Sequence, residues 1–113
     1  MHEPHAVPYV SGCAMYIKQE VIKEVGVFDE GFHPCYFEDS DLCYRVWASN
    51  RTVVVAPGVN ILHHGGASAG QSIESGYKSY QKKHAELFLM KHRAHLTAVK
   101  NKVKSINKSI DLV

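Results

Sequence analysis

The stretch from about Ser75 to about Ser105 restricts the fold most, because almost nothing in it interrupts a helix. It contains no proline, and no glycine beyond Gly76. Since proline and glycine are the residues least compatible with a helix interior, this stretch predicts one long or broken helix. The side chains expected to form its apolar side are Tyr77, Tyr80, His84, Leu87, Phe88 and Met90.

The residues before this helix predict short strands alternating with helices. Residues 6–18 mix β-branched and aromatic side chains around a Ser-Gly pair, which favours a strand. Residues 19–25 have helical spacing, and Gly26 can end that helix with a positive φ. Residues 52–56 and 59–62 are apolar and short, which is typical of buried strands. In chain order, the predicted strands and helices alternate before the long C-terminal helix.

The middle of the chain predicts a turn followed by a second helix. Residues 27–32 combine turn-forming residues with two phenylalanines that can anchor the turn to the core. Residues 38–41 are three acids and a serine, which suit a helix N-terminus, where free N–H groups favour negative charge. Asn50 can end this helix, and Pro57-Gly58 predicts a turn. The apolar stripe of the helix is expected to be Leu42, Cys43, Val46 and Trp47.

Charge is distributed unevenly along the 113 residues, a length that suits one small domain. Residues 1–70 carry four Lys or Arg against eight Asp or Glu, whereas residues 71–113 carry nine against three. A basic tail suits an anionic partner, such as a membrane surface, nucleic acid or an acidic protein face, or is simply a solvated helix. Of the anionic partners, we expect peripheral membrane contact and no nucleic acid.

The three cysteines, Cys13, Cys35 and Cys43, indicate a reducing, cytoplasmic setting. Their odd number argues against a disulfide framework, and none has short metal-type spacing. Cys13 and Cys43 are most simply small buried hydrophobes. No apolar run approaches the roughly 20 residues of a membrane span, and no signal peptide is visible. We therefore expect a soluble chain, cytoplasmic or peripheral at the inner face of the cell membrane.

The acidic cluster at residues 38–41 has two interpretations. It can serve only as a helix cap, with Asp41 pairing to Arg45 one turn later. Capping needs a single residue, however, and four candidates stand together. A carboxylate fixed at a helix start also suits a general base that must meet a hydroxyl at hydrogen-bond distance. Asp39-Ser40-Asp41 matches a nucleotide-sugar metal motif only superficially, because that motif usually follows an apolar strand.

Two groups of histidines are candidate metal ligands. His63 and His64 directly follow a predicted strand, where only one of two neighbouring side chains can face a given site. A single imidazole cannot hold a metal, so carboxylates from elsewhere would be needed. His92 and His95 are three residues apart without a cysteine nearby, which makes a structural role the stronger interpretation.

Four blocks of sequence, taken in order, carry a family resemblance. They are residues 10–15 (VSGCAM), 24–32 (EVGVFDEGF), 36–45 (YFEDSDLCYR) and 63–68 (HHGGAS). Together they resemble family 2 glycosyltransferases, especially the bacterial rhamnosyltransferase-like branch. The resemblance covers roughly residues 7–95, and the Lys91-His92 pair fits the same branch.

The resemblance implies an α/β fold of the GT-A type, in which a first half binds a nucleotide sugar and a second half supplies the acceptor side. For this second half we expect a short mixed sheet, flanking helices and a long C-terminal helix. Only the second half matches here. In such enzymes the Asp of a Glu-Asp pair is the catalytic base, which corresponds to Asp39. The histidine after the later strand, best matched by His63, helps hold a divalent metal, Mn²⁺ or Mg²⁺, on the diphosphate.

The resemblance also implies supporting roles for four further residues. Glu38 and Asp41 would position the loop and the acceptor, while Gly12 and Cys13 would line the floor near the sugar. Residues 1–72 would form the acceptor-side part that carries the catalytic base, and residues 73–113 a basic helical extension.

The leading functional hypothesis is a fragment of an inverting glycosyltransferase. It would transfer a sugar from a nucleotide-sugar donor to a glycan or lipid-linked acceptor in bacterial surface polysaccharide synthesis. Without the nucleotide-binding half, we expect the chain alone to be inactive, and its exposed sheet edge to allow a homodimer. The alternatives are a non-enzymatic binding or assembly module derived from such an enzyme and, less favoured, a small metalloprotein using His63 or His64.

Overall fold

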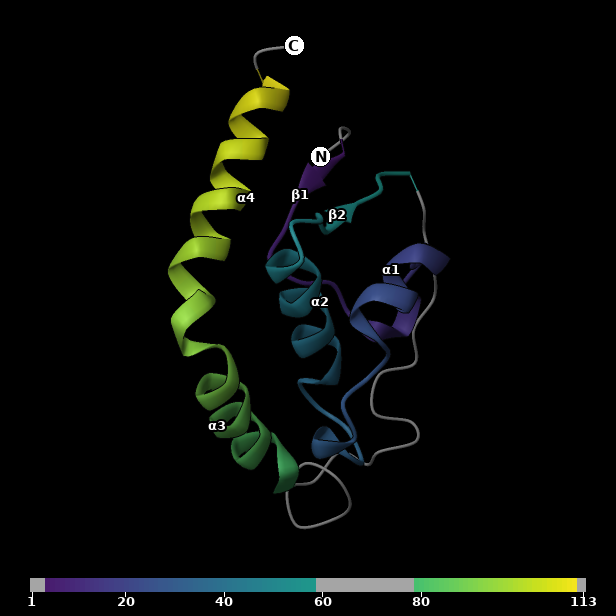
Figure 1. The fold of residues 1–113 in the computed structure, drawn as a ribbon, viewed down its shortest axis with the longest axis vertical. Helices are drawn as coiled ribbons and strands as arrows, with labels where there is room; N and C mark the ends of the chain where they lie inside the picture. The colour runs from purple at the N-terminus through teal and green to yellow at the C-terminus, as the bar shows by residue number, and fades with distance from the viewer. Residues whose placement is uncertain (1–3, 59–78, 112–113) are drawn as a thin grey trace.

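The computed structural model describes residues 4–58 and 79–111, which form a mixed, mostly helical (64%) structure with one two-stranded sheet (Figure 1). Within these residues the α-helices are α1 Gln19–Val25, α2 Glu38–Ala48, α3 Tyr80–His92 and α4 Leu96–Asp111, and the strands are β1 His5–Ala6 and β2 Val54–Val55. The long C-terminal helix of the prediction is present, and α4 runs alongside α2 and β1.

The sheet is smaller than the sequence predicts. β1 pairs with β2 in antiparallel register, with Ala6 opposite Val54. The strand predicted over residues 6–18 is wrong beyond Ala6, and the chain forms a 3-10 helix at Gly12–Ala14. There the Ser11 hydroxyl accepts a hydrogen bond from the Cys13 N–H at 3.3 Å, so a local bond replaces a ladder partner. The predicted strand at residues 59–62 lies outside the described residues.

The helices α1 and α2 begin and end close to the predicted residues. α1 ends where Gly26 adopts a φ of 81° and its N–H donates to the Ile22 carbonyl at 2.8 Å. α2 begins at Glu38 and is followed by Asn50, which has a φ of 64°. The predicted apolar stripe of α2 is confirmed, since its four side chains are all buried: Leu42, Cys43, Val46 and Trp47.

The C-terminal region is a broken helix. This is one of the two forms that the sequence predicts, the other being one continuous helix. A 3-10 segment, Arg93–His95, separates α3 from α4. His84 and Phe88 are buried on the predicted apolar side, but Met90 is 77% exposed and that part of the prediction is wrong. Of the two phenylalanines predicted to anchor the turn at residues 27–32, Phe32 is buried whereas Phe28 is 45% exposed.

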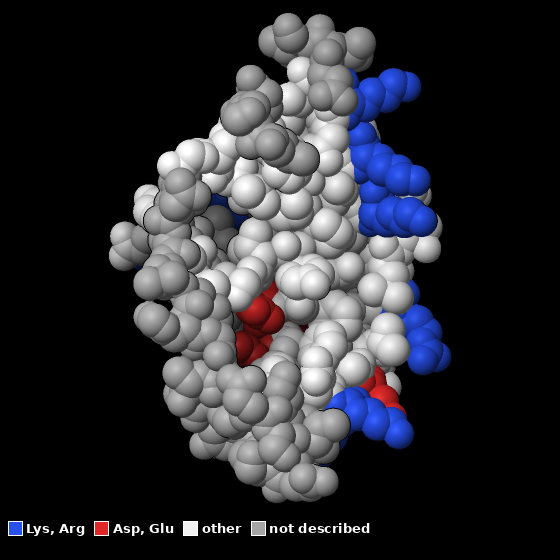
Figure 2. Space-filling view, turned by 180° about the vertical axis from the view of Figure 1, so that it is seen from behind, with Lys and Arg blue, Asp and Glu red and all other residues white. Residues whose placement is uncertain are grey.

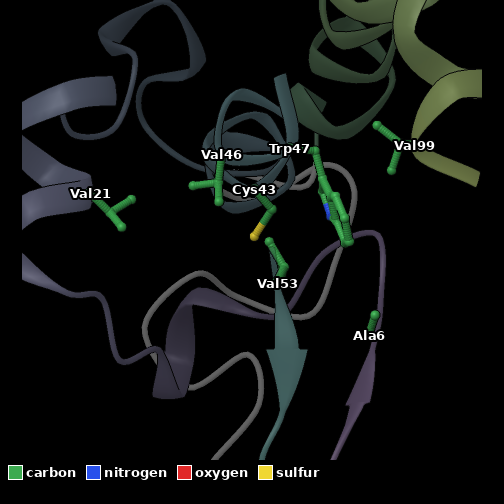
Figure 3. Close-up of a cluster of buried hydrophobic side chains, with 7 residues drawn as sticks. All are labelled: Ala6, Val21, Cys43, Val46, Trp47, Val53 and Val99. Carbon is green, nitrogen blue, oxygen red and sulfur yellow. The ribbon is translucent and has the colours of Figure 1, made fainter. Parts of the chain in front are cut away.

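The hydrophobic core lies between α2, the sheet, α1 and α4. Figure 3 shows seven of its buried side chains, which form one cluster: Ala6, Val21, Cys43, Val46, Trp47, Val53 and Val99. The Trp47 indole N–H donates to the Val7 carbonyl at 3.1 Å. Asn107 of α4 donates to the Ala6 carbonyl at 3.0 Å and accepts from its N–H at 2.7 Å. α4 therefore covers the outer edge of β1 at Ala6.

Within residues 4–58 and 79–111, none of the helices combines the length and the apolar composition that a bilayer crossing requires.

Candidate active site at the start of α2

The backbone before α2 turns sharply and places an acidic pair in the first turn of the helix. Tyr36 and Phe37 both adopt positive φ, 75° and 69°. Such a conformation is strained for residues with a side chain and persists only where the surroundings hold it. Here the Phe37 carbonyl already accepts from the Asp41 N–H at 2.8 Å, so the turn leads directly into α2. Glu38 and Asp39 follow at once.

Asp39 contacts another of the motif blocks through its carboxylate. One oxygen, Oδ2, accepts a hydrogen bond from the Gly12 N–H at 3.0 Å, and Oδ1 accepts from the Ser40 N–H at 2.8 Å. Gly12 lies 27 residues away in the sequence. Each carboxylate oxygen has two lone pairs, so each retains acceptor capacity for a further donor. The structure thus brings together Asp39 and Gly12, two residues of the predicted site.

Space is not the reason for a glycine at position 12. A Cβ there would lie 3.5 Å from the Asp39 Cβ and 3.8 Å from the Phe28 ring, which are ordinary contacts. What the site uses is the backbone N–H of Gly12. Cys13, the next residue, is exposed, so the prediction that it is a small buried hydrophobe is wrong, whereas Cys43 is buried as predicted.

Glu38 lines a cleft of about 500 Å³. The other residues that line the cleft are Phe28, Asp29, Glu30, Phe32, His33 and Pro34. The Glu38 Oε2 atom is buried and has no hydrogen-bond partner among the described residues. Burial raises the pKa of Glu38, and the neighbouring charge of Asp39 raises it further. Figure 2 shows acidic side chains within a hollow on one face of the molecule.

Asp41 lies in a different environment from Asp39, although both belong to the first turn of α2. It is 0% exposed, and its Oδ2 accepts from the Arg45 Nε at 3.0 Å, which confirms the predicted pair. Its Oδ1 lies 2.7 Å from the Lys91 Nζ and 2.6 Å from the His92 Nε2. The carboxylate is thus surrounded by three side chains, two of them from α3. In this structure Asp41 joins α2 to α3.

Lys91 and Arg45 extend this ionic junction to the block at residues 24–32. Lys91 also contacts Asp29 at 2.8 Å. Burial lowers the pKa of Lys91, but hydrogen bonds to Asp29 and Asp41 outweigh it and hold that pKa above its ordinary value. The guanidinium of Arg45 donates to the carbonyls of Val25 and Val27. The segment that lines the cleft is therefore tied to α2 and α3.

The histidines of α3 have structural partners. The His84 Nδ1 lies 2.6 Å from the Cys35 carbonyl, and His92 contacts Asp41. The sequence alone indicates only a weak metal-ligand role for His92. It does not predict that Lys91 and His92 contact Asp41. The sole signal was the fit of the Lys91-His92 pair to the family resemblance.

The predicted metal ligand His63 lies outside the described residues. Among residues 4–58 and 79–111, no three His, Cys, Asp or Glu side chains lie close enough together to hold a metal ion. The described residues do not by themselves form the metal site that the resemblance implies.

Comparisons of the chain with protein-family models, with curated proteins and with solved structures gave no match.

Proposed function

We propose that this chain is the acceptor-side part of an inverting family 2 glycosyltransferase with a GT-A fold, acting in bacterial surface polysaccharide synthesis. The observation that carries the proposal is the hydrogen bond from the Gly12 N–H to the Asp39 carboxylate. It joins two sequence blocks at the residue to which the resemblance assigns catalysis. The contacts of Arg45 with Val25 and Val27 join a third block, residues 24–32, to the block that contains Asp39.

In the proposed reaction Asp39 is the general base. Its oxygens are held by two backbone N–H groups and retain lone pairs for an acceptor hydroxyl. As Asp39 takes the hydroxyl proton, the acceptor oxygen bonds to the anomeric carbon, and the bond from that carbon to the diphosphate oxygen breaks. Attack from the face opposite the leaving diphosphate inverts the configuration. The resemblance assigns donor binding to the preceding half of such a fold, which the four blocks do not include.

The cleft beside Asp39 suits a saccharide acceptor. Phe28 contributes apolar surface to the cleft, and Glu38 contributes a carboxyl group. A sugar ring presents both apolar C–H faces and hydroxyl groups, so it needs this mixture of lining groups. Phe28 also lies next to Gly12, whose N–H binds Asp39, although Asp39 is not among the described residues that line the cleft.

A titration followed by ¹⁵N NMR tests acceptor binding on the chain itself. We expect bacterial surface oligosaccharides to shift the amide resonances of Gly12, Glu38 and Asp39, and Glu38→Gln to weaken binding about fivefold, which corresponds to one lost hydrogen bond. Glu20→Gln, at an exposed position on α1, is the matched control. Shifts confined to other residues would place the acceptor site elsewhere.

Transfer assays test the catalytic assignment. With UDP- or dTDP-sugars and Mn²⁺ or Mg²⁺, we expect no turnover by these residues alone. In a polypeptide that joins them to a donor-binding half, Asp39→Asn should abolish transfer while donor binding persists. Turnover retained by Asp39→Asn would remove this residue from the role of base.

A further inference from the structure

The outward face of α4 carries a row of lysines. Val99 of α4 lies in the core, and Val103 and Ile106 pack against it. Residues four apart in a helix lie on one face, so Lys100, Lys104 and Lys108 share a face away from Val99. All three are exposed. With a rise of about 1.5 Å per residue, the first and the last lie about 12 Å apart along the helix. We call these three residues the basic stripe.

The charges of the basic stripe are not neutralised by the described part of the chain. No described residue forms an ion pair with Lys100, Lys104 or Lys108. Other lysines of this region do have partners, since Lys91 contacts two carboxylates and Lys102 donates to the Trp47 carbonyl.

The sequence around the stripe adds to its positive charge. Between Glu86 and Asp111 there are six Lys or Arg and no Asp or Glu. Figure 2 shows Lys and Arg side chains along one edge of the molecule, apart from the hollow that contains acidic side chains. The positive potential is therefore concentrated on the side of α4.

We propose that the basic stripe docks the protein onto an anionic membrane surface. Clusters of lysines on the outer face of an amphipathic helix are attracted to anionic headgroups, and each contributes as a point charge without a fixed hydrogen-bond geometry. Single-stranded nucleic acid usually requires aromatic side chains for base stacking, and α4 contains none. The docking does not depend on the proposed transferase activity.

Co-sedimentation of the whole chain with lipid vesicles tests this docking. We expect binding to phosphatidylcholine vesicles that contain phosphatidylglycerol, and none to phosphatidylcholine alone. Lys104→Gln combined with Lys108→Gln should weaken binding about 25-fold, because each lysine near the surface contributes about fivefold. Raising the salt from about 0.01 M to about 1 M should abolish binding, since the Debye length falls from about 30 Å to about 3 Å.

The matched control removes the same charge from another face. Lys18 and Lys23 are exposed, at the N-cap and in the last turn of α1, and Lys18→Gln combined with Lys23→Gln should change the affinity less than about threefold. Equal loss in both double variants would show that net charge, and not the basic stripe, binds the vesicles. Equal binding to neutral vesicles, or tighter binding to a DNA duplex than to anionic vesicles in the same buffer, would overturn the proposal.

Discussion

Asp39 and Asp41 lie two residues apart in the first turn of α2, yet their surroundings differ completely. The Asp39 carboxylate is half-buried and contacts two backbone N–H groups. Asp41 is fully buried and contacts Arg45, Lys91 and His92. A 100° rotation per residue along a helix explains the difference, because it turns Asp41 toward α3 and Asp39 toward Gly12. One acidic motif thus supplies both a structural junction and a candidate base.

The comparison shows that partners, and not residue type, determine what each carboxylate can do. A carboxylate surrounded by cationic side chains is costly to remove and has little acceptor capacity left for a ligand. A carboxylate that accepts only N–H hydrogen bonds from the backbone can still receive a proton from a ligand hydroxyl.

The largest expected effect comes from removing the junction. Asp41→Ala should lower the free energy of unfolding by about 3 kcal/mol, because it leaves the buried His92 and two cations without their shared partner. Urea unfolding followed by tryptophan fluorescence measures the change, since Trp47 lies on the same helix. A loss below about 1 kcal/mol would show that the junction contributes little, and would remove the contrast with Asp39.

Arg45→Lys should lower the free energy of unfolding by about 2 kcal/mol, the next largest effect. Lysine keeps the charge but cannot place three N–H groups toward Asp41, Val25 and Val27 at once. Arg51→Lys is the matched control, because Arg51 pairs with Glu24 at an exposed site and should cost less than about 0.5 kcal/mol. Equal losses in the two variants, measured by urea unfolding, would contradict a special role of the Arg45 fork.

Glu38→Gln should raise the free energy of unfolding, whereas the two variants above lower it. This increase should occur only above acidic pH. Burial raises the pKa of Glu38 above its ordinary value of 4.5, so the folded chain holds the proton more tightly than the unfolded chain. The carboxyl therefore stabilises the fold below pH 4.5, and this contribution is lost as the pH rises through the raised pKa.

The amide of Glu38→Gln cannot ionise, so the variant should exceed the wild type in stability at neutral pH and match it in acid. The gain should be no more than about 1 kcal/mol, because solvent screens a charge on a partly exposed side chain. Unfolding curves at the two pH values measure the difference. An equal gain in the free energy of unfolding at neutral and at acidic pH would show that the effect comes from packing and not from the charge of Glu38.

Local features of the fold could be predicted because short-range physics determines them. The positive φ of Gly26 follows from the backbone freedom of glycine, and the buried stripe of α2 follows from helical periodicity. The prediction of a strand over residues 6–18 was wrong because the Ser11 hydroxyl accepts a hydrogen bond from a nearby backbone N–H, in competition with a neighbouring strand. Residue composition does not reveal this competition.

The candidate site could be predicted only in part, because its contacts join residues far apart in the sequence. The acidic cluster and the Asp41–Arg45 pair follow from spacing within one helix. The contacts of Asp41 with Lys91 and His92 span about 50 residues, and nothing in the composition of α3 selects these two side chains over its other cations. The break between α3 and α4 that follows His92 was likewise not located by the pattern.

The smallest effect on stability is expected at Asp39, and it sharpens the comparison most. Asp39→Asn keeps one carbonyl oxygen and loses one of two N–H contacts, so we expect a loss of about 0.5 kcal/mol. The ¹⁵N spectrum should show a shifted Gly12 amide and unchanged amides for Lys91 and His92, because the junction at Asp41 is intact. A loss as large as that of Asp41→Ala would make Asp39 a structural residue as well, and a carboxylate that the fold needs this strongly would be a poor candidate for a base.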